Sequence, residues 1–387
     1  MRDRPTNDES PAEFSQSRAR TRWERAHRQI ASDRVTGALI GPGPDLEYLT
    51  RYQPPPAVAR HVLLVVPSDQ EPTLFVPVSL VTTVESLVAD GVDVRGTTAN
   101  RDLHSHIAEV LPYGKRVGFS EDMPAGHLSR LQALRPDVEF VPLTATSLAF
   151  RIVKDAEEIS LLKDAAAAAD ACFDTFTSTG IRDLSDRELA ERMIAAMHSH
   201  GYDHIDFVMV DSGTGTARPH HETLHGAYPR SSERRIAEGD PVLIDFGGIR
   251  NGYGSDLART VVADRTPDAT LRSVHEVVRE ALEAAMSVIR PGASCKDIDA
   301  AARSVIDEAG YGDFYPHMTG HGVGMTTFEP PYIDPGELGR VASGMCFSLE
   351  PAVYLPGRFG VRLEDVVVVT ESGVERLTRS DHTVRVV

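Results

Sequence analysis

The sequence predicts an α/β N-terminal domain followed by an α+β C-terminal domain. Its 387 residues exceed the usual size of one compact core, so we expect two domains. From about Trp23 to residue 150, short β-like runs such as HVLLVVP (61–67) and TLFVPV (73–78) alternate with helix-like runs, which is typical of an α/β domain. Beyond that stretch, helical segments are separated by paired β-prone runs. We therefore place the two domains at 21–150 and 151–387.

Local signals indicate where ordered structure begins and where helices start. Residues 1–20 are polar and contain no apolar run, so we expect a disordered tail without an export signal. Residues 151–179 have apolar side chains at helical spacing, followed by Gly180 as a stop, which predicts one long helix opening the second domain. Ser185 and Glu188 have the spacing of a capping box, which predicts the start of another helix.

The composition limits the kinds of partner. The chain has 40 Lys and Arg residues against 57 Asp and Glu residues, a formal net charge of −17, which argues against nucleic acid and acidic membranes. No apolar run is long enough to span a bilayer. The 3 cysteines have no C-x-x-C spacing and predict neither a disulfide framework nor a thiolate metal site. We expect a cytoplasmic protein with small or weakly charged partners.

Most of the chemical information lies late in the chain, in four carboxylates and one imidazole. Each stands in a Gly-rich or strand-like run: Asp245 in VLIDFG, Asp256 in GSDLART, His321 in TGHGVG, Glu350 in FSLEP and Glu364 in VRLED. Such a set suits two hard or borderline divalent ions that activate a water molecule. One histidine among four carboxylates favours Mn²⁺, with Co²⁺, Fe²⁺ and Zn²⁺ as the alternatives.

A predicted hairpin brings the two aspartates together. Asn251 and Gly252 can adopt the positive φ angles of a tight turn between two β-prone runs. With this turn, Asp245 lies opposite Ala258. Asp256 then shares the face of Asp245 as a diagonal neighbour.

A second predicted hairpin brings the two glutamates together. If it is centred on Gly357, Glu350 and Glu364 are directly opposed. Like charges paired across strands are destabilising unless a cation lies between them. Both hairpins therefore favour a metal site.

Two competing motifs are less convincing. Residues 221–225 match H-E-x-x-H, the signature of zinc proteases that carry both histidines on one helix. Pro219 lies just upstream and Gly226 follows at once, which argues against a helix there. The D-F-G at 245–247 matches a kinase motif, but the other kinase motifs are missing from the sequence.

In this order and spacing, the five residues resemble those of the superfamily that includes Xaa-Pro aminopeptidase, prolidase, methionine aminopeptidase and creatinase. YLTRYQPPPAVARHVLLVV (48–66) and RIVKDAEEISLLKDA (151–165) resemble the prolidase and aminopeptidase P branch. The resemblance implies a creatinase-like N-terminal domain and a pita-bread catalytic domain. It further implies a homodimeric metallopeptidase that cleaves Xaa-Pro or related imide or amide bonds in small peptides.

The resemblance also implies a role for each metal ligand. Asp245 chelates one ion, whereas Asp256 and Glu364 bridge both ions. His321 and Glu350 complete the other ion's coordination. A hydroxide held between the ions attacks the scissile carbonyl, with Glu350 as proton shuttle.

Three further residues are implied to meet the substrate. His220 in RPHHE and His317 in HMTGHG match catalytic, substrate-side histidines of the family. Arg362, two residues before Glu364, is suited to orient a carboxylate of the site or of the substrate.

The chain departs from the family pattern at three places. Phe328 in FEPP stands where the family has a histidine that meets the substrate, Asp211 replaces a small apolar residue, and the segment around 222–235 is longer than usual. Two alternatives therefore stay open: a hydrolase or lyase of a small non-peptide metabolite on the same fold, and a catalytically silent binding protein. Intact ligands argue against the second.

Overall fold

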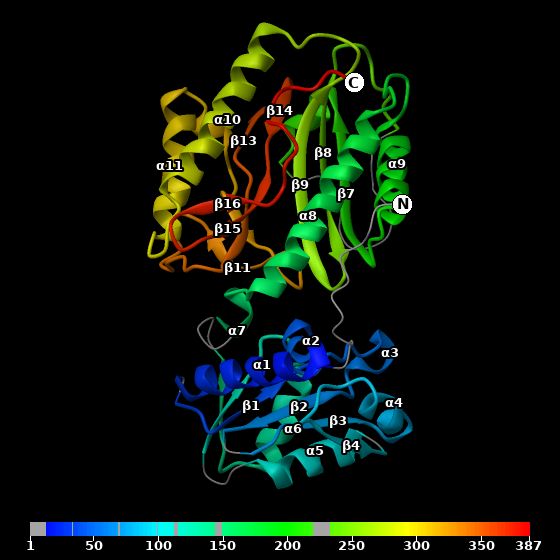
Figure 1. The fold of residues 1–387 in the computed structure, drawn as a ribbon, viewed down its shortest axis with the longest axis vertical. Coiled ribbons are helices and arrows are strands. Elements are labelled where there is room, and N and C mark those ends of the chain that lie inside the picture. The colour runs from blue at the N-terminus through cyan, green and yellow to red at the C-terminus, as the bar shows by residue number, and fades with distance from the viewer. Residues whose placement is uncertain are drawn as a thin grey trace. The chain divides into compact units, whose positions relative to one another are not determined.

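The computed structural model describes residues 13–32, 34–68, 70–98, 100–111, 115–143, 149–219 and 233–387. The chain divides into two compact units, Met1–Arg151 and Ile152–Val387 (Figure 1). An α/β unit is followed by an α+β unit, as predicted from the sequence. Helix α1 (Glu13–Ser32) begins inside the predicted tail of 1–20, earlier than expected, and residues 1–12 lie outside the described residues.

The first unit is built on a six-stranded mixed sheet. Its strand order is β4-β3-β2-β1-β5-β6, and the pairs β1/β5, β3/β4 and β5/β6 are parallel. Parallel neighbours need crossover connections, which the helices supply. The strands are β1 (Gly37–Ile40), β2 (Leu63–Pro67), β3 (Thr73–Pro77), β4 (Asp93–Thr97), β5 (Arg116–Phe119) and β6 (Glu139–Pro142). The helices after α1 are α2 (Pro44–Thr50), α3 (Pro56–Ala59), η1 (Val78–Leu80), α4 (Val81–Glu85), α5 (Asn100–Val110) and α6 (Ala125–Leu134).

The predicted long helix over 151–179 is two helices, because Asp155 starts a new one. Its side chain accepts hydrogen bonds from the backbone N–H groups of Glu157 and Glu158 in a capping box. The predicted capping box of Ser185 and Glu188 is confirmed. The helices of the second unit are α7 (Ala149–Ile152, at the border), α8 (Ala156–Thr177), α9 (Asp186–Ser199), η2 (Gly213–Ala217), α10 (Ala269–Val288), α11 (Cys295–Glu308) and η3 (Gly312–Phe314).

The second unit contains three sheets between two pairs of helices. The sheets have the orders β7-β8-β9, β11-β10-β12-β15-β16 and β13-β14. Helices α8 and α9 pack on β9 and β7, whereas α10 and α11 pack on β14 and β11 (Figure 1). The strands are β7 (His204–Ser212), β8 (Pro241–Arg250), β9 (Tyr253–Val262), β10 (Gly320–Gly322), β11 (Glu329–Ile333), β12 (Cys346–Leu349), β13 (Ala352–Leu355), β14 (Phe359–Arg362), β15 (Asp365–Val369) and β16 (Val374–Arg376).

Within the described ranges, no helix combines the length and the apolar character needed to cross a membrane. The apolar side chains of the second unit instead pack into separate clusters. One lies under α8 and α9, and another lies under α10 and α11. A third, smaller cluster joins α8 to β12 and β15.

Candidate metal centre

The β8–β9 hairpin has the register predicted from its turn. Asp245 pairs with Ala258, and Asp256 pairs two positions further along, opposite Gly247. The turn residues Asn251 and Gly252 have φ angles of 51° and 75°, as a tight hairpin turn requires.

Strand alternation directs both aspartates to the same face of the hairpin. On β8, Ile244 and Phe246 belong to the apolar cluster under α8 and α9. Leu243, on the other face, belongs to the cluster under α10 and α11. Asp245 shares the face of Leu243, because side chains of a strand alternate. Asp245 and Asp256 are therefore buried between the two clusters.

Glu350 and Glu364 lie at a gap between two ladders formed by the same pair of chain segments. The predicted register is present on both sides of them, since Leu349 pairs with Asp365 on one side and Ala352 with Arg362 on the other. The two glutamates therefore occupy opposed positions, as the register predicted, although they lie between the ladders and form no ladder pair themselves.

The backbone N–H of each glutamate donates a hydrogen bond to a third segment instead. The N–H of Glu350 donates to the carbonyl of Thr319 at 2.7 Å, and that of Glu364 donates to the carbonyl of Ala258 at 3.0 Å. Glu350 is thereby tied to the segment leading into β10, and Glu364 to β9. These bonds draw the glutamates toward the histidine and the aspartates.

His321 enters the site on β10, between two glycines that allow close strand packing. A Cβ on Gly320 would lie 1.9 Å from the carbonyl oxygen of Ser348, and one on Gly322 would lie 2.2 Å from that of Pro330. Both distances are prohibitive. Only glycine therefore lets the neighbouring segments approach the imidazole this closely.

The hydrogen bonding of His321 fixes its tautomer. Nδ1 lies 3.2 Å from the carbonyl oxygen of Gly322, which can only accept, so Nδ1 carries the proton. The lone pair of Nε2 then faces the carboxylates, 3.7 Å from Oδ2 of Asp256 and 3.5 Å from Oε1 of Glu350. This is the protonation state that a metal ligand needs.

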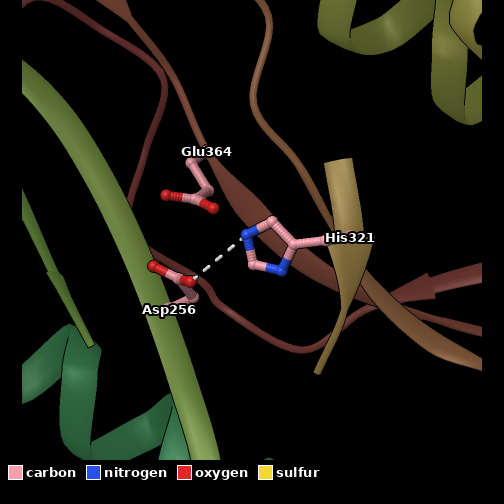
Figure 2. Close-up of side chains that lie close together, drawn as sticks. All are labelled: Asp256, His321 and Glu364. Carbon is pink, nitrogen blue, oxygen red and sulfur yellow. Dashed lines mark ion pairs between the residues drawn. The ribbon is translucent and has the colours of Figure 1, made fainter. Parts of the chain in front are cut away.

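Three of the predicted ligands converge tightly enough to hold one ion. Figure 2 shows Asp256, His321 and Glu364 pointing toward one another from three different segments, and their ligand atoms lie within 4.8 Å of each other. Oδ1 of Asp256 is buried without a hydrogen-bond partner in the described structure. A buried carboxylate oxygen without a partner is costly, and a divalent cation would satisfy it. The residues present therefore fit a metal ion.

The electrostatics of the site support the same conclusion. Burial raises the pKa of Asp245 to about 6 and that of Glu350 to about 7, although Arg362 opposes both shifts. Burial and neighbouring carboxylates raise the pKa of Asp256 and Glu364 well above the ordinary range. The carboxylates are thus crowded in a medium that disfavours their charge, which is the condition a bound cation relieves.

Burial also lowers the pKa of His321 to about 4. The imidazole is therefore neutral at physiological pH and available as a ligand.

Arg362 is fully buried, and its donors are used within the protein. Nη1 donates to Oδ2 of Asp245, Nη2 donates to the carbonyl of Pro219, and Nε donates to the hydroxyl of Tyr354 at 2.9 Å. Arg362 is predicted to orient either a carboxylate of the site or one of the substrate. The structure contains the first of these contacts, with Asp245. His317 joins this group, because its Nε2 lies 2.9 Å from the Tyr354 hydroxyl.

Tyr354 was not identified from the sequence. The signal was present, because Tyr354 is two residues from Ala352, the hairpin partner of Arg362, and so shares its face. His220 and the H-E-x-x-H motif at 221–225 lie outside the described residues, as does most of the extended segment 222–235. Asp211, the second departure, is buried and accepts a hydrogen bond from Arg218 at 3.2 Å.

The chain matches the model of metallopeptidase family M24 over residues 160–371 and that of the creatinase/prolidase N-terminal domain over residues 22–153. A probable dipeptidase PepE of Mycobacterium tuberculosis is 34% identical over 361 residues, covering 91% of this chain and 92% of the relative. An Xaa-Pro dipeptidase of Pyrococcus furiosus is 32% identical over 276 residues, covering 71% of this chain and 77% of the relative.

Solved structures show the same fold over nearly the whole chain. A recombinant prolidase from Thermococcus sibiricus has a TM-score of 0.85 at 31% identity, covering 95% of this chain and 99% of its own. The dipeptidase PepE from Mycobacterium ulcerans has a TM-score of 0.87 at 31% identity, covering 96% and 98%. The chain therefore belongs to metallopeptidase family M24, as an enzyme of the prolidase branch with a creatinase-type N-terminal domain and a pita-bread catalytic domain.

Proposed function

We propose that this enzyme hydrolyses Xaa-Pro or related imide or amide bonds of small peptides with two divalent metal ions. The observation that carries the proposal is the convergence of Asp256, His321 and Glu364 around a buried carboxylate oxygen that has no hydrogen-bond partner in the described structure. Relatives named Xaa-Pro dipeptidase and prolidase support the choice of bond.

The proposed ligand set contains all five residues predicted from the sequence. Asp245, Asp256 and Glu364 would hold one ion, and His321 and Glu350 would hold the other together with Asp256 and Glu364. When bound, such ions lower the pKa of a water molecule and polarise the substrate carbonyl. Oxygen-rich ligation with one imidazole favours Mn²⁺ over Co²⁺, Fe²⁺ and Zn²⁺.

The chain's own side chains supply orientation and proton transfer. Glu350 takes up a proton at a carboxylate oxygen and passes it to the leaving nitrogen. Arg362 holds Asp245 in place through its buried hydrogen bond. We assign substrate contacts to His317 and His220, and the Tyr354 hydroxyl orients the His317 ring.

Metal reconstitution with a substrate panel tests the proposal. Protein stripped of metal is reloaded with Mn²⁺, Co²⁺, Fe²⁺ or Zn²⁺ and assayed on Xaa-Pro dipeptides, longer Xaa-Pro peptides and cyclic amides. We expect hydrolysis of an Xaa-Pro bond that depends on added metal and is fastest with Mn²⁺. Metal-dependent turnover of cyclic amides alone would overturn the peptide assignment.

A second candidate function for the same fold is that of a hydrolase or lyase acting on a small non-peptide metabolite. The exposed ring of Phe328 beside the centre favours it, because this residue cannot donate a hydrogen bond to a peptide group. A silent binding protein is the least supported, since the predicted ligands are intact. A protein that binds none of the four metals would favour it.

We also propose a reducing, cytoplasmic location and a homodimer. Cys172, Cys295 and Cys346 are buried and free in the described structure, which suits a reducing compartment. The dimer is supported by the family resemblance alone. Sedimentation of the metal-loaded protein tests it, and a monomer at micromolar concentration would contradict it.

A further inference from the structure

Phe328 is an exposed aromatic residue in an otherwise buried turn. Its side chain is 54% exposed, whereas its neighbours Thr327 and Glu329 are 8% and 4% exposed. Burial of a large apolar side chain is normally favourable. We therefore expect a bound ligand to cover an exposed ring beside a candidate active site.

The turn that carries Phe328 is anchored on both sides. The hydroxyl of Thr327 donates to Oδ2 of Asp206 on β7 at 2.9 Å. Oε1 of Glu329 accepts from Nζ of Lys154 at 2.6 Å, in an ion pair whose side chains are 3% and 1% exposed. The exposure of the ring is therefore a property of a fixed backbone rather than of a loose loop.

The ring lies against the candidate metal centre. Its centroid is 4.4 Å from that of His321 and 5.5 Å from that of Tyr332, and both pairs are tilted by 38°. Because Nε2 of His321 faces Asp256 and Glu350, only one imidazole separates the Phe328 ring from the site where bond cleavage is proposed. A group of the substrate next to the scissile bond lies within reach of this ring.

We propose that Phe328 is a specificity-determining residue, whose ring contacts a non-polar group of the substrate adjacent to the scissile bond. The inference rests on the proposed function. A phenylalanine ring offers an apolar face and no hydrogen-bond donor, so it favours an aliphatic or aromatic side chain, or a pyrrolidine ring, over a polar group. All three groups are apolar, and a series of substrates that differ in one of these groups at a time distinguishes them.

The test measures kcat/KM for Phe328→Ala, Phe328→His and wild-type enzyme loaded with Mn²⁺. Gly-Pro, Leu-Pro and Phe-Pro vary the residue before the bond, and Leu-Ala replaces the pyrrolidine ring. One methylene in an apolar pocket changes kcat/KM by about 10-fold or more. We therefore expect Phe328→Ala to lower kcat/KM for Leu-Pro and Phe-Pro at least about 10-fold more than for Gly-Pro. A loss confined to the peptides with proline, equal for Gly-Pro and Leu-Pro, would identify the pyrrolidine ring instead.

Phe328→His keeps an aromatic ring but adds polar nitrogens. This variant should therefore lose a larger share of the preference for Leu-Pro and Phe-Pro over Gly-Pro than of the activity on Gly-Pro itself. Leu338→Ala is the matched control, because it removes another exposed large apolar side chain, 90% exposed, from the same unit. Metal content and melting temperature should stay unchanged in both alanine variants. A uniform loss on all four peptides would overturn the inference.

Binding measurements separate a failure of this inference from a failure of the proposed function. Calorimetric titration of the same peptides into Mn²⁺-loaded protein reports contact with Phe328 even without turnover. If no peptide is cleaved but Phe328→Ala weakens binding of Leu-Pro more than of Gly-Pro, the inference stands and the proposed function fails. Equal binding of both peptides to wild type and variant would overturn the inference.

Discussion

Arg259 and Asp365 form a buried ion pair directly behind the candidate metal centre, with 2.7 Å between Nη2 and Oδ1. The second terminal nitrogen of Arg259 donates to the backbone carbonyls of Ala258 and Glu364. Oδ2 of Asp365 in turn accepts from Nε2 of His382 at 2.6 Å. The pair thus holds β9 and the Glu364 backbone together without using any candidate ligand side chain.

Asp365→Asn should therefore destabilise the protein and weaken metal binding together. Burial alone would raise the pKa of Asp365, but Arg259 and His382 hold that pKa well below its ordinary range. Removing the charge leaves a buried guanidinium unpaired, which costs about 3–5 kcal/mol. Urea unfolding and Mn²⁺ titration measure the two effects.

The control for this variant is Glu276→Gln, which breaks an exposed pair with Arg279. Exposed pairs contribute about 0–1 kcal/mol, so this change should be nearly silent. Equal losses in the two variants would contradict the role assigned to Asp365.

Asp256→Asn should separate metal binding from metal-free stability. The amide is a weaker ligand, so metal content and activity should both fall by at least about 10-fold, the scale of defects at metal sites. In metal-free protein at pH 8, the same change removes a carboxyl whose charged form is disfavoured by burial and by the neighbouring carboxylates, so the melting temperature should rise. Calorimetry with and without chelator measures both, and retained activity would place the site elsewhere.

The stability of metal-free protein should fall as pH rises from about 4 to 7. The raised pKa values, about 6 for Asp245 and about 7 for Glu350, mean that the folded state keeps protons that the unfolded chain has already released. His321 and His275, each with its pKa lowered to about 4, act in the opposite direction between pH 4 and about 6.5, but the four carboxyls of the site with raised pKa outnumber them.

Bound Mn²⁺ should reverse this trend, because it requires ionised carboxylates. The increase in melting temperature that Mn²⁺ produces is therefore expected to grow between pH 5 and 8. A gain independent of pH would contradict a site made of these carboxyls.

Gly320→Ala should abolish metal binding by pushing β10 away from Ser348, since its Cβ would lie 1.9 Å from that residue's carbonyl oxygen. Overpacking of this kind costs about 1–3 kcal/mol or more. Gly180→Ala is the matched control, because a Cβ there meets nothing within 4 Å among the described atoms. Melting temperature and Mn²⁺ affinity should fall only in the first variant.

Short-range chemistry explains which parts of the site could be predicted. The β8–β9 register follows from Asn251 and Gly252, because a two-residue turn fixes the pairing of both strands. The register around Gly357 could be predicted because the short connection between Leu355 and Phe359 fixes the pairing there too. The gap in the ladder at Glu350 and Glu364 could not be predicted, since their backbone N–H groups donate to carbonyls in other segments.

Interactions between distant segments left no local pattern to detect. Lys154 and Glu329 are 175 residues apart in the chain and become partners only in the folded protein. The break between α7 and α8 was also missed, because apolar residues keep a helical period through it while Asp155 caps a new helix.

The positions of the candidate ligands along the chain bear on how the metal centre assembles during folding. Asp245 and Asp256 share one hairpin, but Glu364 is far from them in the sequence and is tied to them by the hydrogen bond from its backbone N–H to the carbonyl of Ala258. Folding of the β8–β9 hairpin alone therefore gathers only part of the candidate ligand set. Binding of a metal ion at this centre is thereby coupled to docking of the segment that carries Glu364 on β9.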